Sequence, residues 1–244
     1  LDQMPKSASE KMTQSFLGRQ PKPVFGRPIG IATFGDGRIF ISDADKKQVI
    51  VYDLNKRSVY PFSQTGAIRS PFGLAIDSSE RLYVADAIGK VVLVFDKNDV
   101  PLFTIGNPDL LKHPVFIALD ETRGFVYVSD AQGHRIVVFD MNGKYLRSIG
   151  ELGAQDGQFY GPQGLAVDKA GNLFVADMFN ARIQVFDSAG SFVRKFGERG
   201  DLQWNFEMPK AIAIDSDGNI HITDASKKAM VTYNAEGRLL LLDR

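Results

Sequence analysis

Five copies of one pattern run through the sequence, and their spacing is the strongest constraint on the fold. An aspartate ends the second apolar run of each copy, and a proline opens the first run. The aspartates are Asp43, Asp86, Asp130, Asp177 and Asp224, separated by 43, 44, 47 and 47 residues. The prolines are Pro28, Pro71, Pro114, Pro162 and Pro209, separated by 43, 43, 48 and 47 residues. A repeat of about 40 to 50 residues that contains several short apolar runs is typical of one blade of a β-propeller.

Each copy contains four short runs rich in β-branched and aromatic residues, separated by Gly, Asn, Asp and Ser, which predicts four strands, A to D, joined by turns. In the fourth copy the predicted strands are Gly164–Val167, Leu173–Ala176, Arg182–Phe186 and Phe192–Phe196. Strand D contains Pro61 and Pro101 in the first two copies. Because proline cannot donate a hydrogen bond to a neighbouring strand, D should be the outer edge strand and A the inner strand.

Composition is that of a globular chain rich in turns: 44% of the 244 residues are hydrophobic, and there are 23 Gly and 11 Pro. Twenty-nine basic residues balance 29 acidic ones, so the charge gives no reason to expect a nucleic-acid partner. No apolar stretch approaches the roughly 20 residues needed to cross a bilayer, so membrane insertion is not expected. The absence of cysteine excludes disulfides and thiolate metal sites.

The fourth copy resembles an NHL repeat, through the series Gly161-Pro-Gln-Gly-Leu-Ala-Val-Asp168, Leu173-Phe-Val-Ala-Asp177 and Asn180-Ala-Arg-Ile-Gln-Val-Phe-Asp187. The other copies depart from it at Phe34, Phe116, Ala211 and Asn234. The resemblance implies a β-propeller of the bacterial stand-alone type, usually six-bladed, located outside the cytoplasm and used for binding proteins, nucleic acids or small ligands. Such a fold does not by itself identify a function.

The expected organisation is an N-terminal segment, residues 1–26, followed by the propeller, residues 27–244. The five blades span about 27–69, 70–112, 113–160, 161–207 and 208–244. Three arrangements fit the sequence: a closed five-bladed ring, a six-bladed ring with a reduced blade, and a six-bladed type whose last blade is missing from this chain. Gln14 to Gly18 could supply one outer strand. An unclosed ring would leave a sheet face uncovered and would favour self-association.

The residue after each opening proline marks the point where strand A enters the central channel. These channel-mouth residues are Ile29, Phe72, Val115, Gln163 and Lys210. Propeller lactonases similar to gluconolactonase hold a divalent cation with Glu, Asn and Asp at the channel, and amidating lyases with related repeats use channel histidines for zinc. Neither pattern is present here, which favours a noncatalytic protein without a cofactor. A divalent cation in the channel is left open as the alternative.

The five repeated aspartates after strand B could form a ring of carboxylates at the channel mouth. A residue required at the same place in every blade is more simply a cap on its own B-to-C loop, or a partner for Arg135 and Arg182. We therefore interpret what recurs in every copy as scaffold. Departures from the repeat on the mouth face become the candidate sites.

Two aromatic residues are such departures. Trp204 aligns with Gly157 and lies in a long D-to-A loop, and Phe179 lies in the fourth B-to-C loop, where the other copies have Asp, Ile, Gln and Ser. Together with the mouth residues Phe72, Gln163 and Lys210 they are the candidate contacts for a ligand or partner. Lys210, the one charged mouth residue, would either pair with a loop carboxylate or engage an acidic ligand group.

The three histidines give a weaker hypothesis. His221 occupies the place of Phe40, Tyr83, Tyr127 and Phe174, which predicts a packed strand residue. His113 and His134 fall at the mouth end of the third blade, where they and Asp130 are weak candidates for a metal or acid-base site.

Two functions from different classes follow from these observations. The favoured one is a noncatalytic scaffold that recognises a protein, a peptide or another ligand through its loop-rich mouth face. The alternative is a metal-dependent lactonase or an enzyme similar to the amidating lyases, with its site in the central channel.

Overall fold

The computed structural model describes residues 25–63, 65–200, 202 and 204–243. It contains five four-stranded antiparallel sheets, and in each sheet the strands follow one another in chain order. The proposed outer strand at Gln14 to Gly18 lies outside the described residues. No helix in the described part of the chain has both the length and the apolar character needed to cross a membrane.

The strands of the five blades are as follows. Blade one has β1 (Pro28–Thr33), β2 (Arg38–Asp43), β3 (Gln48–Asp53) and β4 (Ser58–Pro61). Blade two has β5 (Pro71–Ile76), β6 (Leu82–Asp86), β7 (Val91–Phe95) and β8 (Pro101–Ile105). Blade three has β9 (Pro114–Asp120), β10 (Phe125–Asp130), β11 (Arg135–Asp140) and β12 (Tyr145–Ile149). Blade four has β13 (Pro162–Val167), β14 (Leu173–Asp177), β15 (Arg182–Phe186) and β16 (Phe192–Phe196). Blade five has β17 (Pro209–Ile214), β18 (Ile220–Asp224), β19 (Ala229–Tyr233) and β20 (Leu239–Asp243). Two 3-10 helices, η1 (Thr65–Ala67) and η2 (Met178–Asn180), lie in connections.

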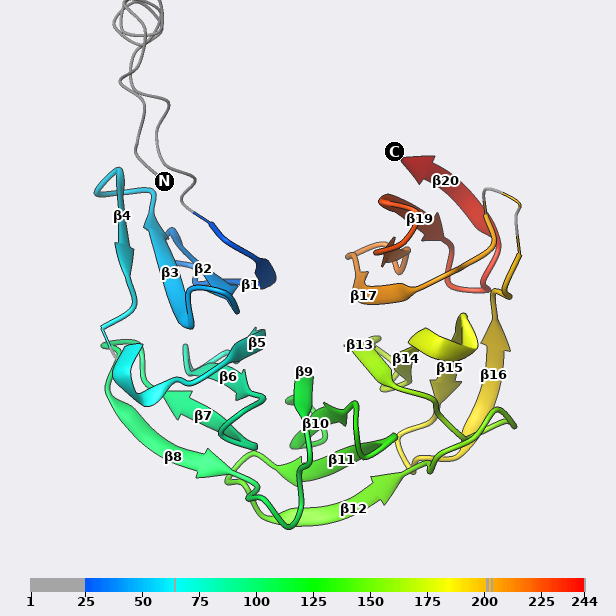
Figure 1. Ribbon diagram of the computed structural model, residues 1–244, viewed down its shortest axis with the longest axis horizontal. Coiled ribbons are helices and arrows are strands. Elements are labelled where there is room, and N and C mark those ends of the chain that lie inside the picture. Colours follow the sequence, from blue (N-terminus) through cyan, green and yellow to red (C-terminus); the bar gives the residue numbers. More distant parts are fainter. Residues whose placement is uncertain (1–24, 64, 201, 203, 244) are drawn as a thin grey trace, which may run out of the picture.

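The predicted order of strands within a blade is confirmed. The A strands β1, β5, β9, β13 and β17 line the centre of the arc, and the D strands run along its perimeter (Figure 1). At three of the four junctions between described blades, those at Gly30, Gly73 and Gly164, neighbouring A strands approach so closely that a side chain would not fit between them. A Cβ added to Gly30 or Gly164 would lie 2.6 Å from the carbonyl oxygen of Phe72 or Lys210 in the next blade. Glycine is therefore a packing requirement at these positions.

Large apolar side chains fill the space between consecutive blades. Four such cores exist in the described chain, one for each neighbouring pair from blades one and two to blades four and five. A residue placed three positions before the opening proline plugs each of them. These plugs are Ile68, Leu111, Phe159 and Phe206, all buried.

Five blades with four interblade cores form an open arc rather than a closed ring. Blades one and five flank the opening, and no core joins them among the described residues (Figure 1). Ile31 and Leu165 hold the same position in their blades, three residues after the proline. Leu165 is 6% exposed within the core between blades three and four, whereas Ile31 is 66% exposed. The face of blade one next to the opening therefore exposes an apolar side chain at Ile31, whereas Ile50 on the same face is 4% exposed.

We expect the same truncation to have different costs at these two equivalent positions. Leu165→Ala should lower the free energy of unfolding by about 2 to 5 kcal/mol, because it opens a cavity in a packed core. Ile31→Ala should change it by about 0.5 kcal/mol or less, because that side chain is already in water. Urea unfolding followed by circular dichroism measures both values. Equal costs would show that the face of blade one is covered in solution.

Candidate functional site

The connections before strand A and after strand B lie at the same end of every blade, because the start of A pairs with the end of B. Pro28 pairs with Asp43, for example, and Pro162 with Asp177. We call this end the loop face. The repeated aspartate joins its two connections. Asp86 accepts hydrogen bonds from the backbone N–H groups of Arg69 (2.8 Å) and Ser70 (2.9 Å), and Asp224 accepts them from the residues before Pro209. The same carboxylates cap their own B-to-C loops, as predicted: Asp86 accepts from the N–H of Gly89 (2.9 Å), and Asp224 from those of Ser226 (3.0 Å) and Lys227 (3.1 Å).

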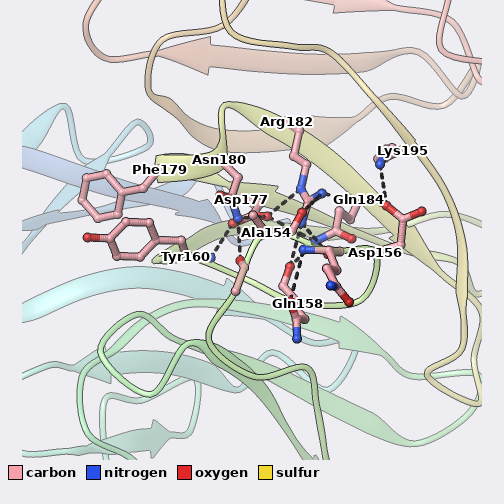
Figure 2. A network of polar contacts seen from close by, with 12 residues as sticks. Ala154, Asp156, Gln158, Tyr160, Asp177, Phe179, Asn180, Arg182, Gln184 and Lys195 are labelled. Carbon is pink, nitrogen blue, oxygen red and sulfur yellow. Dashed lines mark hydrogen bonds and ion pairs between the residues drawn. The ribbon is translucent and has the colours of Figure 1, made fainter.

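The fourth blade extends this arrangement into a buried polar network (Figure 2). Asp177 is fully buried and accepts hydrogen bonds from the backbone N–H of Tyr160 (2.8 Å) and from the side chains of Asn180 (2.8 Å), Arg182 (2.8 Å) and Gln184 (3.2 Å). Burial raises the pKa of the Asp177 carboxyl, and the hydrogen bonds from Asn180, Tyr160 and Arg182 act in the opposite direction. The carboxylate is therefore stabilised entirely by protein donors rather than by water.

Arg182 carries the network into the long loop between β12 and β13. Its guanidinium donates to the backbone carbonyls of Ala154 (2.8 Å), Gln155 (2.8 Å) and Gln158 (2.9 Å). Gln184 donates to the carbonyl of Gln158 as well (2.7 Å). These bonds satisfy carbonyls of the loop, and backbone pairing between Leu152 and Phe159 adds to them, so the loop is tied to the blade at several points.

The held loop, η2 and the connection between β10 and β11 bring three tilted rings together on the loop face. The ring of Tyr160 lies 5.0 Å from that of Phe179 and 5.6 Å from that of His134, centroid to centroid. We call these three residues the aromatic patch. Tyr160 is 49% exposed and Phe179 is 45% exposed, although both are packed against each other. The patch therefore combines an exposed apolar surface with fixed positions.

Backbone contacts fix the patch further. The N–H of Phe179 donates to the carbonyl of Tyr160 (3.1 Å), and Arg199 donates to the carbonyl of Phe179 (3.0 Å). Gly161 has a positive φ of 70°, and a Cβ there would lie 2.6 Å from the Phe179 ring. Its N–H donates to Nδ1 of His134 (3.2 Å), so a neutral His134 carries its proton on Nε2.

Sequence reasoning selected Phe179 but missed Tyr160. Tyr160 stands two residues before the opening proline, where the other copies have Gly26, Arg69, Lys112 and Glu207. The same search for departures from the repeat would have found it.

The structure does not bring Trp204 to the patch. Trp204 is exposed and lines a separate hollow of about 330 Å³ with Tyr233 and Leu239, and its carbonyl accepts a hydrogen bond from the Tyr233 hydroxyl (3.1 Å). Because the D strands run along the perimeter, the loop that follows β16 lies beside the outer hairpin of blade five (Figure 1). Trp204 and Phe179 therefore belong to two different surfaces.

The weak metal candidates are also kept apart. His113 packs edge-on against Phe72 (5.5 Å between centroids), whereas His134 belongs to the aromatic patch. Asp130 uses its oxygens on the backbone N–H groups of Lys112 and His113. Burial lowers the pKa of His113, so its imidazole is neutral at pH 7. Within the described chain, no group of three His, Asp or Glu side chains is placed to hold a metal ion.

His221 is a strand residue, as predicted, but it is not packed in an interblade core. Its ring is partly exposed and bonds to Asp215 (3.1 Å) and Thr232 (3.0 Å). The equivalent Tyr83 donates to Asp77 in the same way and is fully buried by blade three. The difference arises because no described blade covers the corresponding face of blade five.

Removing one charge from the buried network should destabilise the protein strongly. Asp177→Asn removes the buried counter-charge of the Arg182 guanidinium and leaves only the exposed Asp156 at 3.9 Å, which we expect to cost about 3 kcal/mol. Asp187→Asn is the matched control, since Asp187 caps the turn of Ala189 and Ser191 without an arginine partner and should cost about 1 kcal/mol. Urea unfolding of both variants checks this difference. Similar losses in the two variants would contradict the assigned role of the Asp177–Arg182 pair.

Comparisons with known proteins agree with this architecture. The DUF5128 family, described as a 6-bladed beta-propeller, matches residues 168–241. No curated protein matches the sequence significantly. The five blades described here are thus one fewer than the number given for that family.

Solved structures show the same fold at low sequence identity. A catalytically inactive variant of virginiamycin B lyase from Staphylococcus aureus, bound to quinupristin, has 12% identity and a TM-score of 0.68, covering 90% of this chain and 71% of the lyase. A Bacteroides thetaiotaomicron protein of unknown function has 19% identity and a TM-score of 0.71. The match covers 88% of this chain and 57% of the Bacteroides chain. A chain of the nidogen/laminin complex has 19% identity and a TM-score of 0.71, and the match covers 89% of this chain and 80% of that one. Because these relatives have different roles, the likeness concerns the fold alone.

Proposed function

We propose that this protein is a noncatalytic recognition scaffold of the NHL-repeat type, which binds a protein or peptide at its loop face. The observation that carries the proposal is the aromatic patch. Tyr160 and Phe179 expose nearly half of their surface, although the buried Asp177 network holds the backbone beneath them in place. Single exposed apolar residues are common on protein surfaces, whereas a cluster of aromatic rings in fixed positions has the composition that binding hot spots favour.

The geometry of the patch favours a partner with an apolar or aromatic side chain. Rings that are already ordered lose little conformational entropy when a partner covers them, so more of the contact free energy is available for binding. Polar groups surround the rings: the Tyr160 hydroxyl, the His134 imidazole and the Arg199 guanidinium that donates to Phe179. An apolar centre with a polar rim matches the anatomy of protein interfaces. The balanced net charge supports a protein or peptide rather than a nucleic acid.

A binding experiment tests the patch directly. Peptides selected by display on the immobilised protein are titrated calorimetrically against the wild type, Tyr160→Ala and Phe179→Ala. We expect each substitution to weaken binding by tenfold or more, as is usual for buried aromatic anchors. Tyr145→Ala is the control, because Tyr145 is an exposed tyrosine of comparable accessibility on the perimeter strand β12. Unchanged affinity in both patch variants would exclude this surface as the binding site.

The second candidate is an enzyme with its site at the channel, either a lyase or a metal-dependent lactonase. It is favoured by the likeness to virginiamycin B lyase and by His113, a neutral imidazole next to the mouth residue Phe72. Incubation with quinupristin and with a panel of lactones, each with and without added divalent cations, distinguishes the two functions by mass spectrometry. We expect no conversion above a heat-denatured control. Turnover that is lost in His113→Ala would overturn the noncatalytic proposal.

A further inference from the structure

The five channel-mouth residues form a continuous row around the inside of the arc. The backbone of Gly30 packs on the carbonyl of Phe72, that of Gly73 on the carbonyl of Val115, and that of Gly164 on the carbonyl of Lys210. In each blade the pairing of strand A with strand B shifts register directly after the proline, so the mouth residue lies in a β-bulge. Bulges re-aim side chains, and here the same bulge recurs at one end of every inner strand.

Lys210 is the cation of this row, and the described residues give it no counter-ion. Its side chain is partly buried, and it has neither a hydrogen bond nor an ion pair within the described chain. Burial lowers the pKa of Lys210, and the positive charge of Arg27 lowers it further. Arg27 precedes β1 on the other side of the opening, and it is close enough for its charge to act on Lys210. A partly buried cation next to a second cation is electrostatically unfavourable unless an anion joins them.

Arg27 does not have the same need of an anion. Its guanidinium pairs with Asp45 (3.1 Å) at an exposed position, and Asp43 fixes its backbone by accepting from its N–H (3.1 Å). An ion pair this exposed is weak, so the guanidinium remains able to contribute to a neighbouring site. Lys210 is therefore the principal cation, and Arg27 is a second positive charge nearby.

Gln163 supplies a neutral donor beside Lys210, on the adjacent inner strand. The residue is 8% exposed, and its carboxamide has no hydrogen-bond partner among the described residues. The carboxamide is not sealed inside the protein, so its atoms reach solvent. A nearly buried amide whose free end faces solvent is available to donate to a bound group.

The rest of the row contains nothing that would repel an anion. Ile29, Phe72 and Val115 are apolar, and the imidazole of His113 beside Phe72 is neutral at pH 7. No carboxylate acts on Lys210 from the described part of the chain. Lys210 thus stands at the end of the row formed by blade five, and the apolar residues Val115, Phe72 and Ile29 follow toward the end formed by blade one.

We propose that the channel mouth binds an anionic group, a carboxylate or a phosphate, through the ammonium of Lys210 and the carboxamide of Gln163, with Arg27 as a second positive charge. Hydrogen bonds from an ammonium to an oxyanion are among the stronger ones in proteins. This site uses none of the residues of the aromatic patch, so it stands independently of the proposed function. A ligand bound at the mouth would present an acidic head group to Lys210 and apolar parts to Val115 and Phe72.

Titration of the full chain with simple anions tests the site. Sodium phosphate or sodium acetate is added at constant ionic strength, balanced with sodium chloride, and amide chemical shifts are recorded. We expect saturable shifts at Gly164, Lys210 and Ala211 with at least one of the two anions. Saturation with phosphate alone identifies a phosphoryl site, and saturation with acetate identifies a carboxylate site.

Two lysine variants decide whether Lys210 is responsible. Lys210→Gln should weaken the saturable binding at least tenfold, since it removes a charge-assisted hydrogen bond. Lys112→Gln is the matched control, because Lys112 is an exposed lysine at the same end of blade three, and its affinity should be unchanged. In wild-type protein with methylated lysines, the pKa of Lys210 should rise when the anion is added. Shifts that grow linearly without saturation, equal affinities in the two variants, or a pKa of Lys210 that does not respond would each overturn the proposal.

Discussion

The carboxylate at the end of strand B is the interaction on which each blade depends. Asp43, Asp86, Asp130, Asp177 and Asp224 each accept backbone N–H groups from the residues just before strand A, 16 to 18 positions earlier in the chain. Although burial opposes ionisation, the N–H groups of Lys46, Arg27, Gly26 and Asp45 lower the pKa of Asp43. Hydrogen bonds to a charged acceptor contribute about 1.5 to 3 kcal/mol each. This contact therefore holds the residues before strand A against the end of strand B on the loop face.

Apolar packing between consecutive blades holds the blades side by side. Four apolar cores join five blades, and the faces next to the opening differ in character. Blade one presents the exposed aliphatic side chain of Ile31, whereas blade five presents His221 with its partners Asp215 and Thr232. Ile31 is equivalent to Leu165, which is buried in blade four, and this explains why an apolar residue stands there although its side chain is exposed.

The two proposed sites use departures from the repeat in different ways. The aromatic patch depends on the buried network of blade four, where Arg182 and Gln184 donate to carbonyls of the long loop before β13. The mouth site depends on a lysine that replaces the apolar residues found at the same bulge in the first three blades. At both sites the backbone of the repeat sets where the side chains lie, and side chains that do not recur in the other blades, such as Phe179 and Lys210, give the site its chemical character.

The sequence by itself determined the propeller fold, the order of strands, the inner position of strand A and the capping role of the repeated aspartates. These features recur in every blade, because each blade must satisfy the same backbone groups and bury the same faces. Only the tertiary structure separated Trp204 from Phe179, joined Tyr160 to His134, drew His113 and His134 apart and placed Lys210 opposite Arg27. Those contacts join different blades or long loops, and they follow from packing across blades, which a pattern read along one chain does not contain.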